Sequence, residues 1–155
     1  MEEYTVENYL ITNKTIALLK RGKKTLIYDV DKVVVINKTI HKIIDLSCNY
    51  YGSSLEGRKK SAKNILNQKY KIPIVIDEVN NLILIPLNNP RLEDCLYVVV
   101  NKIVDYYELE DNLVIMCVNN QEFKTKMSKK TLEKLIISAF KLNNILNHRK
   151  NANFL

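Results

Sequence analysis

Two of the three glycines in the chain, Gly52 and Gly57, enclose a pair of serines, and basic residues follow at once. Glycine lets the backbone turn sharply or approach a ligand closely. Small residues at a helix start can offer backbone N–H groups to a phosphate. The cations that follow are Arg58, Lys59, Lys60 and Lys63. This pattern favours binding of a phosphate-rich partner, but a tight turn before an ordinary solvated helix would produce the same pattern.

The charge of the chain is unevenly distributed along its 155 residues. The net charge is +7, and residues 54–72 hold six cations against the single acid Glu56. Residues 73–113 reverse this balance with eight acids and two cations. A polarised basic protein can be steered toward nucleic acid or another polyanion. The abundance of lysine and asparagine also fits the codon usage of an AT-rich genome, so charge alone does not decide between the two.

The length and composition predict one domain over residues 1–155, with residues 147–155 as a frayed polar tail. No apolar run reaches the length of a membrane span, and the acidic N-terminus is unlike a signal peptide. We therefore expect a cytoplasmic protein without a membrane partner. The three cysteines are Cys48, Cys95 and Cys117. Their odd number and apolar surroundings predict buried, reduced thiols and no disulfide or zinc site.

A catalytic group is conceivable in only one place. His41, Asp45 and Cys48 could share one face of a helix, which would suit an activated thiol. Cys48, however, continues the apolar stripe of that helix, as a small core residue does. The chain has none of the common phosphate-loop, dinucleotide, metalloprotease or paired-cysteine motifs. We therefore expect no enzyme, no catalytic residue, no metal site and no cofactor.

Hydrophobic periodicity predicts an α+β fold of mainly antiparallel sheet and hairpins with about three helices. The helices are expected near residues 39–50, 53–67 and 129–146. The strands are expected at residues 9–12, 15–20, 24–29, 32–36, 74–77, 82–87, 96–109, 113–118 and 122–127. The stretch 96–109 can be one long strand or two strands with a bend, and residues 88–90 form a loop.

The second predicted helix carries the basic residues. Ser53 and Glu56 fit a capping box, in which each side chain bonds to the backbone of the other residue. Helical spacing places Lys59, Lys60 and Lys63 on one flank, beside a buried apolar stripe. Because the Glu56 carboxylate would then occupy the helix N-terminus, we expect a phosphate to bind further along, at the lysines.

Residues 45–59 read D-L-S-C-N-Y-Y-G-S-S-L-E-G-R-K. This stretch resembles the ComK family of competence transcription factors, whose members carry D-x-S-C-x-aromatic-aromatic-G-S-S-x-x-G-R-K. The likeness covers roughly residues 10–140. It continues through residues 13–18, 71–77, 82–86, 90–95 and 114–132.

The resemblance implies a transcription activator of natural-transformation genes that binds AT-rich double-stranded DNA as a homo-oligomer, through the minor groove. Arg58 would then enter a narrow, electronegative groove, and the lysines would contact phosphates. The expected DNA-binding residues are Gly52, Ser53, Ser54, Gly57, Arg58, Lys59, Lys60 and Lys63. Two other functions stay open: a non-enzymatic interaction module that modulates a full-length relative without its own DNA site, and an RNA-binding protein.

The sequence departs from the family pattern in several places. No tryptophan follows Cys95, the turn at residues 119–121 lacks a glycine, and the segment after Ser128 is unusually rich in lysine. The resemblance also implies a proteolytic adaptor as a partner. The C-terminus is shorter than the tail that serves this control in some family members, so transactivation and proteolytic control through such a tail stay open.

Overall fold

The computed structural model describes residues 3–87 and 95–152, so the predicted loop at 88–90 lies outside the described residues. The helices of this part are α1 (Ile40–Tyr50), α2 (Leu55–Leu66) and α3 (Lys129–Asn151), with short 3-10 turns η1 (Val100–Lys102) and η2 (Val118–Asn120). The strands are β1 (Glu3–Val6), β2 (Thr15–Arg21), β3 (Lys24–Asp29), β4 (Val33–Ile36), β5 (Ile74–Asp77), β6 (Leu82–Pro86), β7 (Leu96–Val99), β8 (Ile103–Leu109), β9 (Asn112–Cys117) and β10 (Glu122–Thr125). The predicted α+β class is confirmed.

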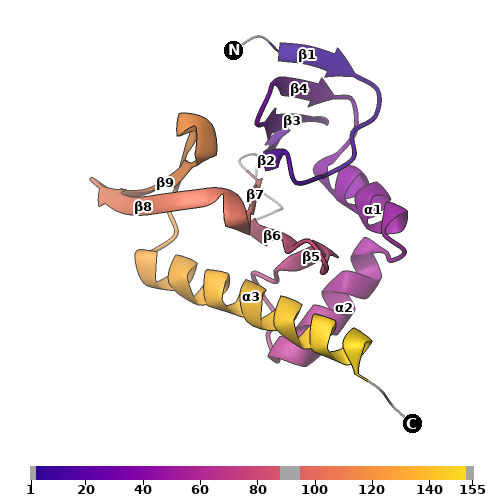
Figure 1. The fold of residues 1–155 in the computed structure, drawn as a ribbon. Coiled ribbons are helices and arrows are strands. Elements are labelled where there is room, and N and C mark those ends of the chain that lie inside the picture. Colours follow the sequence, from indigo (N-terminus) through magenta and orange to yellow (C-terminus); the bar gives the residue numbers. More distant parts are fainter. Residues whose placement is uncertain (1–2, 88–94, 153–155) are drawn as a thin grey trace.

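The described strands form two sheets. The larger has the order β1-β4-β3-β2-β7-β6-β5, and every neighbouring pair is antiparallel except β1 and β4. The smaller sheet, β10-β9-β8, is wholly antiparallel and projects to one side of the molecule (Figure 1). We call the projecting β8–β9 hairpin the arm.

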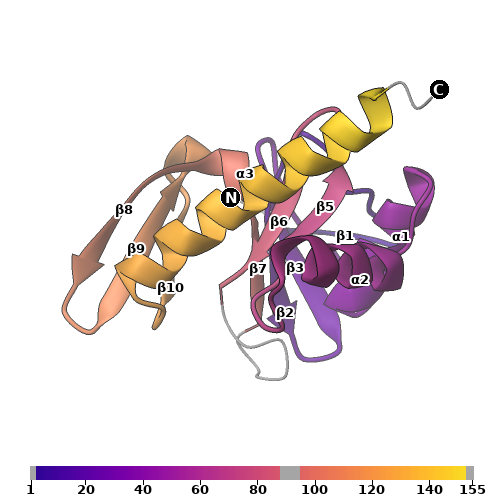
Figure 2. The same cartoon turned by 90° about the horizontal axis from the view of Figure 1, so that it is seen from below.

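Alternation along the strands of the large sheet gives it two apolar faces. Leu18 and Ile27 pack with α1 and the start of α2, whereas Ala17 and Val98 pack with α3 and the small sheet. Helix α3 crosses both sheets, and α1 and α2 lie together at the end far from the arm (Figure 2). Helix α2 contributes Leu55 to one core and Ala62 to the other, so it bridges the two layers.

The last helix is longer than the sequence indicated. Ser128 caps it by accepting a hydrogen bond from the Thr131 N–H, and the helix continues to Asn151. The prediction of a frayed tail from residue 147 is therefore wrong for residues 147–151. The polar side chains of Asn147 and Lys150 are bonded to Glu78, which holds the final turns in place.

One strand prediction is wrong, and the structure decides between the two forms expected for residues 96–109. Residues 9–12 form no strand, because their polar groups bond to side chains instead of a ladder: the Ile11 N–H donates to Ser47 Oγ and the Tyr9 hydroxyl donates to Asp29. Residues 96–109 form two strands, which belong to different sheets and are separated by η1. The sharp turn at η1 is what directs the arm away from the main body.

Leu132→Ala should lower the free energy of unfolding by about 2–5 kcal/mol, because this fully buried side chain of α3 joins the core beneath the sheets. Urea denaturation followed by circular dichroism measures the loss. Ile137→Ala on the same helix is the control: that side chain is 67% exposed, and the change should stay within about 0.5 kcal/mol. Equal losses in the two variants would contradict this placement of α3.

Candidate nucleic-acid interface

The junction between α1 and α2 is a tight turn built on Gly52. Its φ of +87° is a conformation that side-chain-bearing residues rarely adopt, which explains why glycine stands here. The Gly52 N–H donates to Asn49 O, and the Ser53 N–H donates to Cys48 O. The turn thus supplies hydrogen-bond donors to the carbonyl groups at the end of α1, and it reverses the chain into α2.

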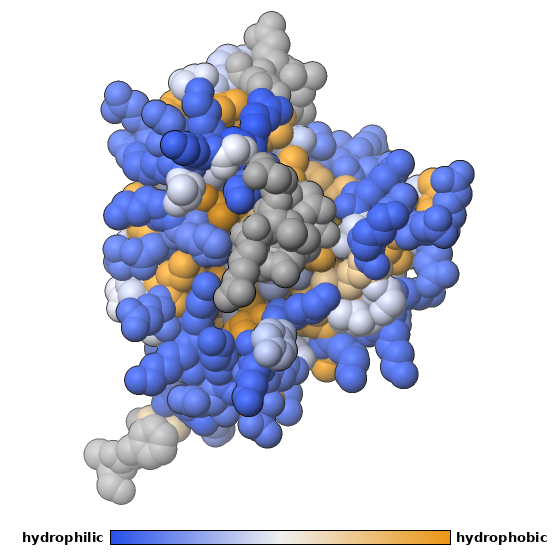
Figure 3. Space-filling view, turned by 180° about the vertical axis from the view of Figure 1, so that it is seen from behind, coloured by the Kyte–Doolittle hydropathy of each residue, from blue (hydrophilic) through white to orange (hydrophobic). Residues whose placement is uncertain are grey.

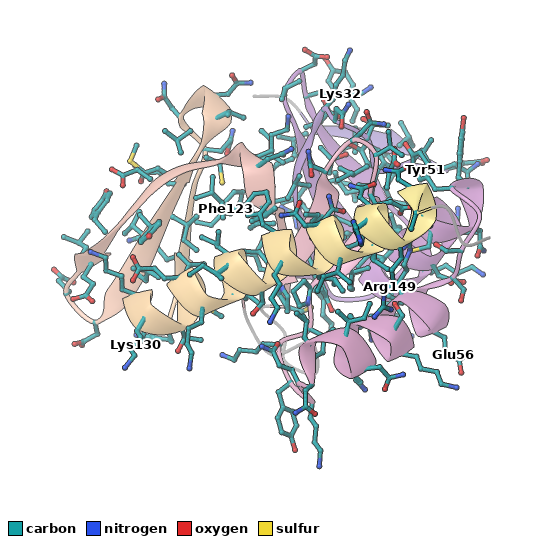
Figure 4. The ribbon with its side chains drawn as sticks, turned by 60° about the horizontal axis from the view of Figure 1, so that its bottom comes forward. Lys32, Tyr51, Glu56, Phe123, Lys130 and Arg149 are labelled. Carbon is teal, nitrogen blue, oxygen red and sulfur yellow. The ribbon has the colours of Figure 1, made fainter. Side chains whose placement is uncertain are left out.

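Helix α2 is capped by Ser54, one residue later than the capping box predicted. The Ser54 hydroxyl accepts a hydrogen bond from the Gly57 N–H at 3.0 Å. A Cβ at Gly57 would lie 3.1 Å from that hydroxyl, so glycine leaves room for the cap. Glu56 does not close a box with Ser53; it points outward from the first turn of α2 (Figure 4).

Most polar side chains of the sequence motif are bonded inside the protein. Asp45 accepts from the Leu55 N–H at 2.9 Å and so fixes the start of α2 against α1. Ser47 donates to Ile43 O and accepts from the Ile11 N–H. Ser53 donates to Cys48 O at 3.2 Å. The motif therefore builds the α1–α2 junction.

Arg58 is also internal, although we predicted it at the DNA. Its side chain is only 8% exposed, and Nη2 lies 2.7 Å from the Glu78 carboxylate, which is 7% exposed. Its Nε donates to Ser53 Oγ at 3.1 Å. The guanidinium thus links the α1–α2 junction to the β5–β6 turn, and this placement is at odds with insertion into a DNA groove.

Glu78 binds partners from two helices, α2 and α3. Besides Arg58, its carboxylate binds Lys150, and its backbone carbonyl accepts from Asn143 and Asn147 of α3. Burial alone would raise the pKa of Glu78, but hydrogen bonds from Lys150 and Arg58 outweigh burial and leave the pKa below the ordinary value of 4.5. The carboxylate therefore stays ionised at neutral pH and holds α2 and α3 together.

The lysines of α2 have the opposite placement. Lys60 and Lys63 are exposed and Lys59 is half-buried, while Leu55, Arg58 and Ala62 occupy the buried side. The surface of the molecule as a whole is mainly hydrophilic in Figure 3, with hydrophobic patches between the hydrophilic side chains, including patches on the arm. On α2 the exposed side is basic. We call Lys59, Lys60 and Lys63 the lysine flank. It gives α2 an outward-facing positive charge close to the glycine–serine turn.

The groups considered for catalysis have environments unlike those of reactive residues. Burial raises the pKa of the Cys48 thiol to about 11 and that of Cys117 to about 12, so both stay protonated at neutral pH. All three cysteines are buried, and none of them forms a disulfide bond in the described part of the chain. Among the described residues, no three His, Cys, Asp or Glu side chains gather as metal ligands would. No helix in that part of the chain has the length and apolarity needed to cross a bilayer.

Comparison with known proteins gives a match over nearly the whole chain. The sequence profile of the ComK protein family matches residues 6–151. The chain belongs to the ComK family. It is also similar to the protein named competence transcription factor from Bacillus subtilis (strain 168), with 32% identity over 94 residues. That alignment covers 58% of this chain and 49% of the relative, so it spans about half of the relative's length. No solved structure is a significant match.

In the structure, the motif shared with the ComK family forms the α1–α2 junction and the first turns of α2. Of the predicted contact residues, Gly52, Ser53, Ser54 and Gly57 shape the junction and Arg58 is buried, while the lysine flank carries the cations that reach the surface. The structure therefore brings all eight residues into one turn and one helix but divides them between two roles.

Sequence reasoning did not identify Glu78 or its partners on α3. Glu78 lies between the predicted strands at residues 74–77 and 82–87, where a polar residue is ordinary, and the predicted helix near 129–146 ends before Asn147 and Lys150. One signal was available: Arg58 projects to the edge of the apolar stripe of α2, away from the lysines. A lone cation beside a buried stripe requires an acidic partner elsewhere in the chain.

Glu78→Gln should lower the free energy of unfolding by about 3–5 kcal/mol, because it leaves the buried Arg58 charge without its carboxylate. The control is Lys14→Ala, which breaks an exposed ion pair with Asp31 and should cost less than about 1 kcal/mol. Chemical denaturation of both variants gives the comparison. A loss at Glu78 no larger than that at Lys14 would contradict the proposed importance of the buried pair.

The stabilisation from Glu78 should also depend on pH in a defined direction. Folding lowers the pKa of the Glu78 carboxylate. Such a group stabilises the fold fully above the pKa that it has in the unfolded chain, and this stabilisation is lost as the pH falls through the pKa of the folded protein. The difference in unfolding free energy between the unaltered protein and Glu78→Gln should thus shrink below about pH 4.5. A difference that grows on acidification would show that the sign is wrong.

Proposed function

We propose that this protein is a competence transcription factor that binds AT-rich double-stranded DNA through the minor groove, as a homo-oligomer, and activates natural-transformation genes. Membership of the ComK family and the name of the Bacillus subtilis relative support this proposal. A protein with this activity works on the chromosome, in the cytoplasm at the nucleoid. A proteolytic adaptor is a further partner that the family resemblance suggests.

The observation that carries the proposal is the lysine flank. Lys60 and Lys63 extend from a helix whose opposite side is fixed in the core, so their charges are presented from a rigid base. Lysines in this position can neutralise phosphates and can follow the negative potential of a narrow A-tract minor groove. Reading of this kind needs few base-specific hydrogen bonds, which suits a surface with many lysines.

The roles of the predicted contact residues are revised in the proposal. Arg58 supports α2 from inside, because its guanidinium is already engaged by Glu78 and Ser53. The residues that contact DNA are Lys59, Lys60 and Lys63. Gly52, Ser53, Ser54 and Gly57 shape the α1–α2 turn so that its backbone can lie close to the duplex. The outward position of Glu56 limits phosphate approach to the first turn of α2, which favours contact further along the helix.

The alternative, an interaction module without its own DNA site, draws support from the arm. Residues 103–113 contain four acids and no lysine or arginine in a chain of net charge +7. On β8, Val104 is 67% exposed and Leu109 is 48% exposed. An acidic, partly apolar strand at the edge of a sheet is suited to a basic protein partner and unsuited to DNA.

A mobility-shift or anisotropy titration with an AT-rich duplex at two salt concentrations tests the proposal. We expect tighter binding at low salt, because phosphate contacts release counterions. Lys60→Ala combined with Lys63→Ala should weaken binding by about tenfold or more at moderate salt and flatten the salt dependence. GC-rich duplex and single-stranded RNA serve as competitors, and the AT-rich duplex should be preferred over both.

Lys130→Ala combined with Lys134→Ala is the matched control, because it removes two exposed lysines near the start of α3. Lys130 lies well away from α2 (Figure 4). This variant should retain most of the affinity. Equal weakening by the two pairs would mean that net charge alone governs binding. A complete lack of salt-dependent binding by the unaltered protein would favour the interaction module.

A further inference from the structure

A second group of positive residues lies beside the lysine flank, on the sheet face that α1 covers. Lys20 follows Leu18 by two residues along β2, so both side chains point to the same face, where Leu18 packs with Ile40 and Ile43 of α1. Lys20 also pairs across the sheet with Thr25, whose hydroxyl donates to Lys38 O just before α1. These contacts place Lys20 next to the N-terminal end of α1.

His41 occupies the first turn of α1 at this position. Its ring is half-buried and meets the Tyr97 ring of β7 edge-on, with centroids 6.3 Å apart. Burial lowers the pKa of His41, and the positive charges of Lys59 and Lys20 lower it further. The Leu55 N–H of α2 is bonded to Asp45, which lies one turn after His41 on α1. Because the chain reverses between the two helices, Lys59, one turn after Leu55, comes to lie on the His41 side of α1.

Among the described residues, two acids on neighbouring elements, Asp45 of α1 and Asp77 of β5, have other partners. Asp45, one turn along α1 from His41, accepts the Leu55 N–H. Asp77 of β5 lies toward the other end of α1, where its charge contributes to raising the pKa of Tyr51, after the larger effect of burial. Lys20, His41 and Lys59 thus form a cluster from three elements, which we call the three-residue cluster. Two of its members are permanently positive, and the third becomes positive on protonation.

We infer that the three-residue cluster is a second point of contact for the duplex backbone, so that the DNA surface runs from the lysine flank across α1 to the β2–β3 hairpin. This inference rests on the DNA binding proposed above. Lys59 belongs to both the flank and the cluster and joins them into one surface. Figure 2 shows α1 and α2 at the end of the molecule away from the arm, with β2 nearer the middle.

The physical basis is the mutual repulsion of like charges in the unbound protein. In the unbound protein, Lys20 and Lys59 repel each other and disfavour the protonated form of the half-buried His41. A phosphate at this position would relieve the repulsion and favour the protonated form of His41. DNA binding should therefore take up a proton at His41, and affinity should rise as pH falls through the neutral range.

The test uses the full chain and a fluorescent AT-rich duplex, with affinity measured at several salt concentrations and between about pH 7.5 and 5.5. Lys20→Ala should reduce the slope of log affinity against log salt by about 0.9, as expected for one lost phosphate contact. The unaltered protein should bind about three- to tenfold more tightly at the acidic end, whereas His41→Gln should lose this gain.

Two matched controls accompany these variants. Lys32→Ala removes an exposed lysine at the opposite end of β3 from the hairpin, and His148→Gln removes the other histidine, near the end of α3. Both should keep the salt slope and the pH gain of the unaltered protein. Thermal unfolding shows whether each variant is folded, and the Lys20 salt slope tests the inference even if His41→Gln is unstable.

The outcomes separate this inference from the proposed function. If the unaltered protein binds duplex but Lys20→Ala behaves as Lys32→Ala does, the second contact is absent and DNA binding through α2 survives. A pH gain that persists in His41→Gln would likewise exclude His41 as the proton acceptor. If the unaltered protein shows no salt-dependent duplex binding at all, the proposed function itself fails.

Discussion

The buried ion pair between Arg58 and Glu78 is the interaction on which the arrangement of the helices depends. A charged guanidinium at 8% exposure is tolerable only when its donors are satisfied, and here Glu78 and Ser53 satisfy two of its nitrogens. The same glutamate receives Lys150 from α3. One residue in a hairpin turn thereby sets the position of α2 relative to the sheet and of α3 relative to α2. Such a pair adds specificity of arrangement more surely than net stability.

Much of the fold was predictable because local signals agreed with the tertiary structure. Apolar periodicity located all three helices, and residues suited to capping, Thr39 and Ser128, stand directly before α1 and α3. The failures occur where distant groups replace local ones. The segment at residues 9–12 has strand-like composition, but Ser47 takes its backbone donor. The final turns of α3 have a polar sequence that predicts fraying. In the structure, however, Lys150 of these turns is bonded to Glu78, which lies 72 residues earlier in the chain.

The candidate site shows the same limit at finer scale. Its location at residues 52–63 could be found from the glycines, the serines and the clustered cations. The separation of roles could be found only in part: helical projection sets Arg58 apart from the lysines, but its partner Glu78 lies 20 residues away in the sequence. Only the position of Glu78 decides which cation is internal. The motif thus forms a rigid helix junction, and the lysine flank owes its fixed orientation to bonds made on the other side of α2.

The sequence separation within the Glu78 network bears on how the chain folds during synthesis. Arg58 is 20 residues from Glu78, so these two can pair soon after the β5–β6 hairpin has formed. Asn143 and Lys150 are 65 and 72 residues away, so they leave the ribosome much later than Glu78 does. Until then the Glu78 carbonyl lacks the donors that α3 supplies, and the apolar side of α3 is missing from the core. The nascent protein can therefore order the α1–α2 junction early, but it completes its native state only when the last turn of α3 has been made.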